Sequence, residues 1–211
     1  MVRAVQDAGA RVAAIDRIAS VQAPSSLADA LLLGDVDVDS STSAARAFEI
    51  VSKRLGGLDA LVNVAGMFRW ETLENGAADT WDLLYKSNLR TAVSSSKAAL
   101  PYLLRRGAGR IVNIGAQAAS KAAAGMGAYA ASKAGVARLT ESLAEELKDR
   151  AITVNAILPS IIDTPQNRRD MPSADFTRWV APTAVALPIV FLLSDAAAAI
   201  TGALIPVSGR V

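Results

Sequence analysis

Short runs rich in valine, isoleucine and leucine alternate with longer alanine-rich stretches along the whole chain. This alternation is typical of a parallel sheet whose strands are joined by helices that cover both of its faces. We therefore predict an α/β fold, a doubly wound parallel sheet in a single domain over residues 1–211. Asp39 or Ser40 can cap one helix, and Gly56 can end it. The expected strands are 11–15, 30–33, 58–64, 110–114, 152–158 and 204–207, and the expected helices are 43–55, 78–105, 128–148 and 183–193.

The composition removes whole classes of chemistry, because the chain contains no histidine and no cysteine. Histidine bases, Ser-His-Asp triads, thiol nucleophiles and Cys/His metal sites are excluded, and we expect no metal. Any proton transfer must therefore use tyrosine, lysine, aspartate or glutamate. The lack of cysteine also agrees with a reducing, cytoplasmic location.

Charge and hydropathy argue against a nucleic-acid or membrane partner. The formal net charge is +2 and the basic residues are spread out, so no basic patch of the kind that binds nucleic acid is formed. The most apolar stretch, 181–193, contains Pro182 and Pro188, and it is shorter than the ~20 residues of a membrane span. We expect a buried helix there. The N-terminus shows no signal-peptide pattern, and a small-molecule substrate is the expected partner.

The segment Tyr129-Ala-Ala-Ser-Lys133 places a tyrosine and a lysine four residues apart, on one face of an expected helix. A phenol with a pKa near ~10 is a poor proton donor or acceptor at neutral pH, but an adjacent ammonium would lower that pKa. Alone, the pair is weak evidence, because a surface Tyr/Lys pair is the commoner arrangement. Its position after a strand and at the start of a long helix makes it a candidate acid/base pair.

Eight segments, in order, resemble the short-chain dehydrogenase/reductase family, whose members have a Rossmann-type fold and are nicotinamide-dependent oxidoreductases. Together the segments span nearly the whole chain. They are Asp16, Asp37-Val38, LVNVAG at 61–66, SNL at 87–89, GRIVNIGA at 109–116, YAASK at 129–133, ITVNAILPS at 152–160 and ITGALIPVSG at 200–209.

The resemblance implies catalytic roles for three residues. Tyr129 would exchange a proton with the substrate oxygen or nitrogen. Lys133 would lower the pKa of Tyr129 and bind the nicotinamide ribose, and Asn88 would hold the water that links Lys133 to solvent. The alternative for Asn88 is a structural role at a helix kink.

The resemblance also implies a cofactor site with a preference for NAD(H). A carboxylate at Asp16 can accept hydrogen bonds from the ribose hydroxyls and would repel a 2'-phosphate, whereas Arg17 next to it could pair with that phosphate, so NADP(H) stays possible. A solvated Asp/Arg loop pair is the structural alternative. The remaining expected cofactor contacts are Asp37, Val38, Asn63, Ala65, Gly66, Pro159, Ile162 and Thr164, of which the small residues could instead simply pack a helix on a strand.

The chain departs from the family at Ala116, where a serine normally donates a hydrogen bond to the substrate. Gln117 is polar and adjacent, but its side chain is expected to point elsewhere. The dihydropteridine reductase branch of the family also lacks the serine, and the segment 161–179, with VAGMF at 64–68, resembles it. We therefore expect a carbonyl, alcohol or pterin-like C=N substrate that contacts Ala116, Gln117, Phe68 and Trp179, under a lid at 161–182. A lid shared by relatives of other specificity is the alternative.

A second departure lies at the start, where the segment 1–17 reads as the end of a first helix followed by the second strand. The family's first strand and Gly-rich phosphate loop have no counterpart, and that strand lies in the middle of its sheet. We expect the chain to be N-terminally incomplete or a damaged relative. The family resemblance further implies a homodimer or homotetramer formed through the helices 78–105 and 128–148. The competing hypothesis is a non-catalytic nucleotide-binding or scaffold protein.

Overall fold

The computed structural model describes residues 1–19 and 29–211. Four parallel strands form the main sheet in the order β3-β4-β5-β6, and two more, β1 and β2, form a parallel pair. The strands are β1 (Ala13–Ile15), β2 (Leu31–Leu33), β3 (Ala60–Asn63), β4 (Gly109–Ile114), β5 (Ile152–Pro159) and β6 (Leu204–Val207). They coincide with the six expected strands to within two residues at each end.

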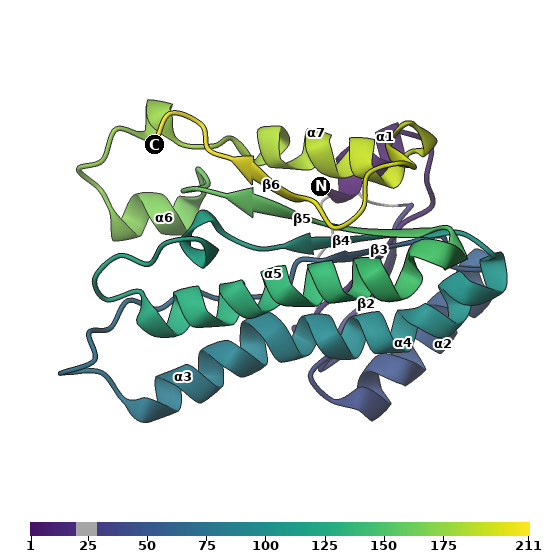
Figure 1. Cartoon of the computed structure of the whole chain (residues 1–211), viewed down its shortest axis with the longest axis horizontal. Helices are drawn as coiled ribbons and strands as arrows, with labels where there is room; N and C mark the ends of the chain where they lie inside the picture. Colours follow the sequence, from purple (N-terminus) through teal and green to yellow (C-terminus); the bar gives the residue numbers. More distant parts are fainter. Residues whose placement is uncertain (20–28) are drawn as a thin grey trace.

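Helices cover both faces of the strands, which confirms the doubly wound α/β architecture (Figure 1). On one face lie α2 (Ser41–Leu55), α4 (Thr91–Arg106) and α5 (Gly127–Leu147), and on the other lie α1 (Val2–Asp7) and α7 (Pro182–Leu193). The neighbouring strand residues Ile111 and Val112 belong to two different buried clusters, because successive side chains of a strand point to opposite faces. Every residue of β5 is buried, as a strand covered on both faces must be.

Local signals set the ends of α2 as expected. The Ser40 side chain accepts a hydrogen bond from the Ser43 amide, so Ser40 is the cap, and Gly56 ends the helix in the left-handed region with φ 72°.

The expected single helix 78–105 is three consecutive helical segments. These are α3 (Ala78–Leu84), the π-helix η2 (Tyr85–Arg90) and α4. A π-helical turn inserted in an α-helix often marks a functional position, and here it carries Asn88.

The α7 segment is half-exposed and not the buried helix that its composition predicted. Ile189 and Leu192 face the core, whereas Leu187 and Phe191 are 67% and 45% exposed. An evenly apolar sequence does not show which side of a helix is covered. Across residues 1–19 and 29–211, no helix combines the length and apolar character that crossing a membrane requires.

A cavity of about 700 Å³ lies between β1 and β3, the two strands that border the gap between the sheets. The Leu31 amide donates to the Val12 carbonyl and the Asp16 amide to the Leu33 carbonyl, so alternate residues of β1 are bonded to β2. In a parallel ladder the residues between them, Ala13 and Ile15, turn their backbone groups the other way, toward the cavity. Within the described ranges no strand pairs with these groups. The resemblance places its first strand in this gap.

Candidate active site

Tyr129 and Lys133 lie in the first two turns of α5, at the carboxyl end of β4. Lys133 is 5% exposed, and its Nζ donates a 2.7 Å hydrogen bond to the carbonyl of Ile114, the last residue of β4. The Tyr129 ring meets the Phe68 ring edge-on, with 4.9 Å between centroids. Ligands of open parallel sheets bind beyond the carboxyl ends of strands, and this is where the pair stands.

Burial controls the protonation of both groups. It lowers the pKa of Lys133 to about 8 and raises the pKa of the Tyr129 phenol above its ordinary value. The expectation that Lys133 lowers the pKa of Tyr129 stays a prediction. The Lys133 ammonium donates its hydrogen bond to the Ile114 carbonyl, and within the described residues no contact joins it to the Tyr129 phenol. Tyr129 is consequently protonated at neutral pH and can act as a proton donor.

Asn88 ties the π-helix to its surroundings. Its Oδ1 accepts a 2.7 Å hydrogen bond from the Met67 amide, and its Nδ2 donates to the Met67 carbonyl and to Ser132 Oγ. Ser132 Oγ in turn donates to the Tyr129 carbonyl at 2.7 Å. Asn88 thus positions the turn that follows β3 against the helix that carries Tyr129, which matches the structural alternative; the water-holding role stays a prediction.

Gly66 lets the turn after β3 pack closely against these residues. A Cβ atom at this position would lie 2.8 Å from Asn88 Oδ1 and 3.3 Å from Lys133 Nζ, so a side chain here would displace one of them. The Lys133 ammonium has N–H donors beyond the one that it gives to Ile114. The residues present therefore fit the ribose hydroxyls at the nicotinamide end of a dinucleotide.

Asn63 has a different environment from the one expected. Its Nδ2 donates to Asn113 Oδ1 at 2.8 Å and to Ser96 Oγ at 3.0 Å, and Asn113 donates to Thr140 Oγ1. The side chain belongs to a buried polar network that joins β3, β4, α4 and α5. Sequence reasoning missed this network, although polar residues inside otherwise apolar runs are a signal for one. Asn63 still lines the large cavity, together with Val38 and Ala65.

The expected adenosine residues gather at the ends of β1 and β2. Asp16 follows β1 directly, is exposed, and accepts a 3.0 Å hydrogen bond from the Ile18 amide. Its carbonyl accepts the Val36 amide, so it lies beside the turn that bears Asp37 and Val38. Arg17 is exposed at the same corner.

The lid segment 161–182 is more ordered than its sequence indicated. It contains the short helix α6 (Pro165–Asp170), whose cap is Thr164, and its base is closed by a bridge between Ile162 and Val180. Pro159 ends β5 just before it. Trp179 is 8% exposed and packs on Phe176, with 4.8 Å between ring centroids, so its ring is held within the lid.

Ala116 lies at the end of β4, is buried, and supplies no hydrogen-bond donor from its side chain. The Gln117 amide donates to Ser208 Oγ, in the loop after β6, so it points away along the sheet as its position predicted. Ser160 Oγ donates to the Ser208 carbonyl at 2.6 Å. The missing serine is therefore not replaced by Gln117 in this arrangement.

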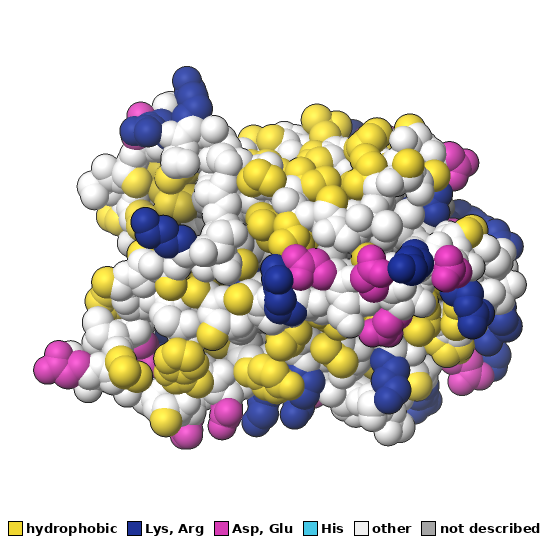
Figure 2. All heavy atoms as spheres, viewed as in Figure 1, with side chains coloured by type: hydrophobic (Ala, Val, Ile, Leu, Met, Phe, Trp, Pro, Cys, Tyr) yellow, Lys and Arg dark blue, Asp and Glu magenta, His cyan; other side chains and the backbone are white. Residues whose placement is uncertain are grey.

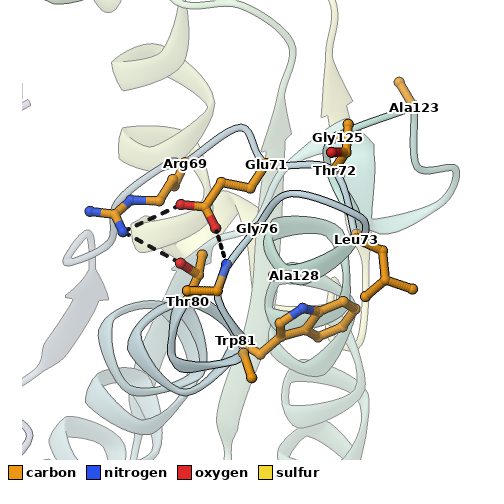
Figure 3. A pocket seen from close by; sticks show the side chains of 13 residues that line it. Arg69, Glu71, Thr72, Leu73, Gly76, Thr80, Trp81, Ala123, Gly125 and Ala128 are labelled. Atoms are coloured by element: carbon orange, nitrogen blue, oxygen red, sulfur yellow. Dashed lines mark hydrogen bonds and ion pairs between the residues drawn. The ribbon is translucent and has the colours of Figure 1, made fainter.

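A second cavity of about 390 Å³ lies between α3 and the start of α5 (Figure 3). Arg69 reaches Glu71 Oε1 at 3.5 Å and Thr80 Oγ1 at 3.4 Å, and Glu71 accepts the Ala77 amide. Trp81 stands at its rim. Its lining includes the first residues of α5 but neither Tyr129 nor Lys133, so it borders α5 without containing the candidate pair. The sequence had given no sign of this cavity.

In the described part of the chain, no group of acidic residues could hold a metal ion.

Comparison with known proteins adds relatives over most of the chain. A family model described as enoyl-(acyl carrier protein) reductase matches residues 1–209. The chain is 37% identical over 183 residues to 3-oxoacyl-[acyl-carrier-protein] reductase FabG of Pseudomonas aeruginosa, which covers 82% of this chain and 74% of the relative. It is 31% identical over 181 residues to acetoacetyl-CoA reductase of Allochromatium vinosum, with 82% and 74% covered.

A third relative extends over the full length of both proteins. It is named inactive 2-(S)-hydroxypropyl-CoM dehydrogenase 2, from Xanthobacter autotrophicus, and is 31% identical over 225 aligned positions that cover 99% of this chain and 98% of the relative. None of these three relatives is named as a pterin reductase, so the comparisons do not support the dihydropteridine reductase branch.

Proposed function

The chain belongs to the short-chain dehydrogenase/reductase family of NAD(P)-dependent oxidoreductases, and on this basis we propose that it interconverts a small-molecule carbonyl and its alcohol with Tyr129 as the acid/base. The observation that carries the proposal is the site at the end of β4. There a protonated phenol and a buried ammonium lie one helical turn apart on α5, and Gly66 packs closely against the ammonium.

The residues of the site divide the work between them. A bound nicotinamide supplies or accepts the hydride. Tyr129 Oη donates its proton to the substrate oxygen as C=O becomes C–OH, and it takes the proton back in the oxidation direction. Lys133 has three N–H donors, so it can bind ribose hydroxyls while it keeps its bond to Ile114. Its positive charge then stabilises the phenolate that forms.

We infer a preference for NAD(H) from Asp16, with NADP(H) as the other possible cofactor. The exposed Asp16 carboxylate would accept ribose hydroxyls and repel a 2'-phosphate. Asp16→Ala should therefore reduce the ratio of kcat/KM for NADH over NADPH. An unchanged ratio would assign the preference to Arg17 or another group.

For the substrate, the relatives' names favour a 3-oxoacyl compound, and acetoacetyl-CoA is the probe we choose. Ala116 favours a second candidate, a quinonoid dihydropterin. Its C=N bond takes up electrons that rearrange into its own ring and needs no second donor.

The test is an assay of NADH and NADPH oxidation with both substrates, using the wild type and Tyr129→Phe. Turnover by the wild type and its loss in Tyr129→Phe, with nucleotide binding kept, is the expected result. Tyr85→Phe, which changes an exposed tyrosine of η2, is the matched control. Nucleotide binding without turnover of any substrate would instead support the non-catalytic hypothesis, for which the inactive full-length relative is a precedent.

A further inference from the structure

Asp39 and Arg90, 51 residues apart in sequence, form a bidentate ion pair. Arg90 Nε donates to Oδ1 of Asp39, and a terminal guanidinium nitrogen donates to Oδ2. The hydrogen bonds from Arg90 hold the pKa of the Asp39 carboxyl below its usual value. Two parallel N–H···O bonds fix orientation as well as distance, so this pair can set the position of one segment against another.

The two ends of the pair hold different parts of the site. At one end, the Asp39 amide donates to Asp37 Oδ1 at 3.0 Å and the Ser40 amide donates to the Asp37 carbonyl, which shapes a tight turn that includes Val38. At the other end, Arg90 is the last residue of η2, the π-helix that contains Asn88. The ion pair therefore fastens the turn 37–40 to the segment that positions the Tyr129 helix.

The turn lies at the surface, after a residue with positive φ. Asp37 is exposed and Asp35 has φ 57°, outside the usual range for a residue with a side chain. Arg90 and Lys86 are the cations that act on the Asp39 carboxylate. Val38 faces the large cavity that Ala65 also lines, so a shift of the turn would move one wall of that cavity.

We propose that Asp39 and Arg90 are positioning residues for the adenosine end of the cofactor, which they order by holding the turn of Asp37 and Val38 against η2. The inference rests on the proposed function, because it takes that turn as part of the dinucleotide site. It assigns a role to two residues that touch neither the reacting atoms nor the substrate.

The test compares binding of NADH with binding of reduced nicotinamide mononucleotide, which lacks the adenosine half. Asp39→Asn and Arg90→Gln should each weaken NADH binding about fivefold, a size in keeping with one bidentate ion pair, and leave mononucleotide binding within about twofold. Calorimetry measures both. The double variant should bind no more weakly than either single variant, because the second substitution removes nothing further.

Charge alone predicts a different pattern. Asp39→Asn raises the net charge and Arg90→Gln lowers it, so a purely electrostatic effect on an anionic ligand would have opposite signs in the two variants. Opposite signs would overturn the proposal, and so would an equal loss of mononucleotide binding. Arg106→Gln, which breaks the exposed Arg106–Asp59 pair between α4 and the start of β3, is the control and should leave the ratio of the two affinities unchanged.

Hydrogen exchange without nucleotide supplies a second readout. The amides of 37–40 should exchange faster in Asp39→Asn and in Arg90→Gln than in the wild type. Unchanged exchange would show that the ion pair does not hold this turn, and would overturn the proposal. A wild type that binds neither ligand would refute the proposed function and this inference with it. A wild type that binds NADH no more tightly than its two variants do would refute this inference alone.

Discussion

Lys133 places a positive charge in a buried position and gives it one hydrogen-bond acceptor, the Ile114 carbonyl. Burial lowers its pKa from 10.5 to about 8, so the unfolded chain binds more protons than the folded one between these two values. The free energy of unfolding should therefore rise with pH across this window, and the cost of the buried charge is fully present below about pH 8.

Lys133→Met should remove that cost. The variant should be more stable than the wild type near neutral pH, by ~1.4 kcal/mol for each unit of the pKa shift as an upper bound, and the difference should shrink toward pH 10.5. Urea unfolding of both proteins at three pH values measures it. A stability difference that does not change with pH would show that the buried charge is not the cause.

Ala116 is the residue at which the choice between substrates can be tested. Removing one hydrogen-bond donor from the developing oxyanion typically costs ~10²- to 10³-fold in rate. Ala116→Ser should therefore raise kcat on acetoacetyl-CoA by tenfold or more and change the rate on a quinonoid dihydropterin little. Ala119→Ser, three residues further along the same loop, is the control. Equal rates on acetoacetyl-CoA before and after the Ala116 change would mean that another group already supplies the second donor.

At the scale of elements, sequence patterns predicted all six strands and most helix ends, because each strand is an apolar run and glycines in the left-handed region, Gly56 and Gly107, end α2 and α4. They did not predict the π-helix η2. Asn88 in this segment bonds to Met67, 21 residues away in sequence, and a periodic pattern carries no information about such contacts. The buried network of Asn63, Asn113 and Thr140 was missed for the same reason.

The helices α3, α4 and α5 present an apolar surface that we expect to bind a second copy of the chain. Trp81, Tyr85, Val93 and Leu104 are large hydrophobic side chains with 37–49% exposure along the first two helices and η2. Figure 2 shows hydrophobic side chains over this part of the molecule, separated by polar and charged ones. Several exposed large apolar side chains along the same helices agree with the interface that the family resemblance implies.

Tyr85→Glu should therefore weaken a homodimer or homotetramer, because it places a charge inside the contact. Light scattering at micromolar concentration should show a lower mass for the variant than for the wild type. Leu187→Glu, at an exposed residue of α7 on the opposite face of the strands, is the control and should leave the mass unchanged. A monomeric wild type would contradict the expectation.

At the scale of the whole molecule, the sequence predicted which residues meet at the carboxyl end of β4 better than it predicted the cavity in the sheet. Tyr129, Lys133 and Asn88 come together because β4 and α5 form as their patterns indicate. The gap between β1 and β3 was expected from the resemblance, but its consequence, a cavity of about 700 Å³ bordered by strand edges that have no strand partner within residues 1–19 and 29–211, required the structure. A strand that paired with these edges would add ladder hydrogen bonds and bury apolar surface.

Supplying a strand to the gap should stabilise the molecule as a whole. We expect an apolar, valine-rich segment followed by a glycine-rich turn and joined ahead of Met1 to pair with the backbone groups of β1 and β3 that face the cavity and to fill that cavity. The midpoint of thermal unfolding should rise by at least ~5 °C, since 1 kcal/mol corresponds to ~2–4 °C for a chain of this size. NADH binding should tighten as well, because the turn would bring backbone amides to the pyrophosphate.

The matched control carries prolines at alternate positions of the added strand, which removes the N–H groups that would donate hydrogen bonds to the neighbouring strands. Equal midpoints for the two fusions would show that the gap does not accept a strand.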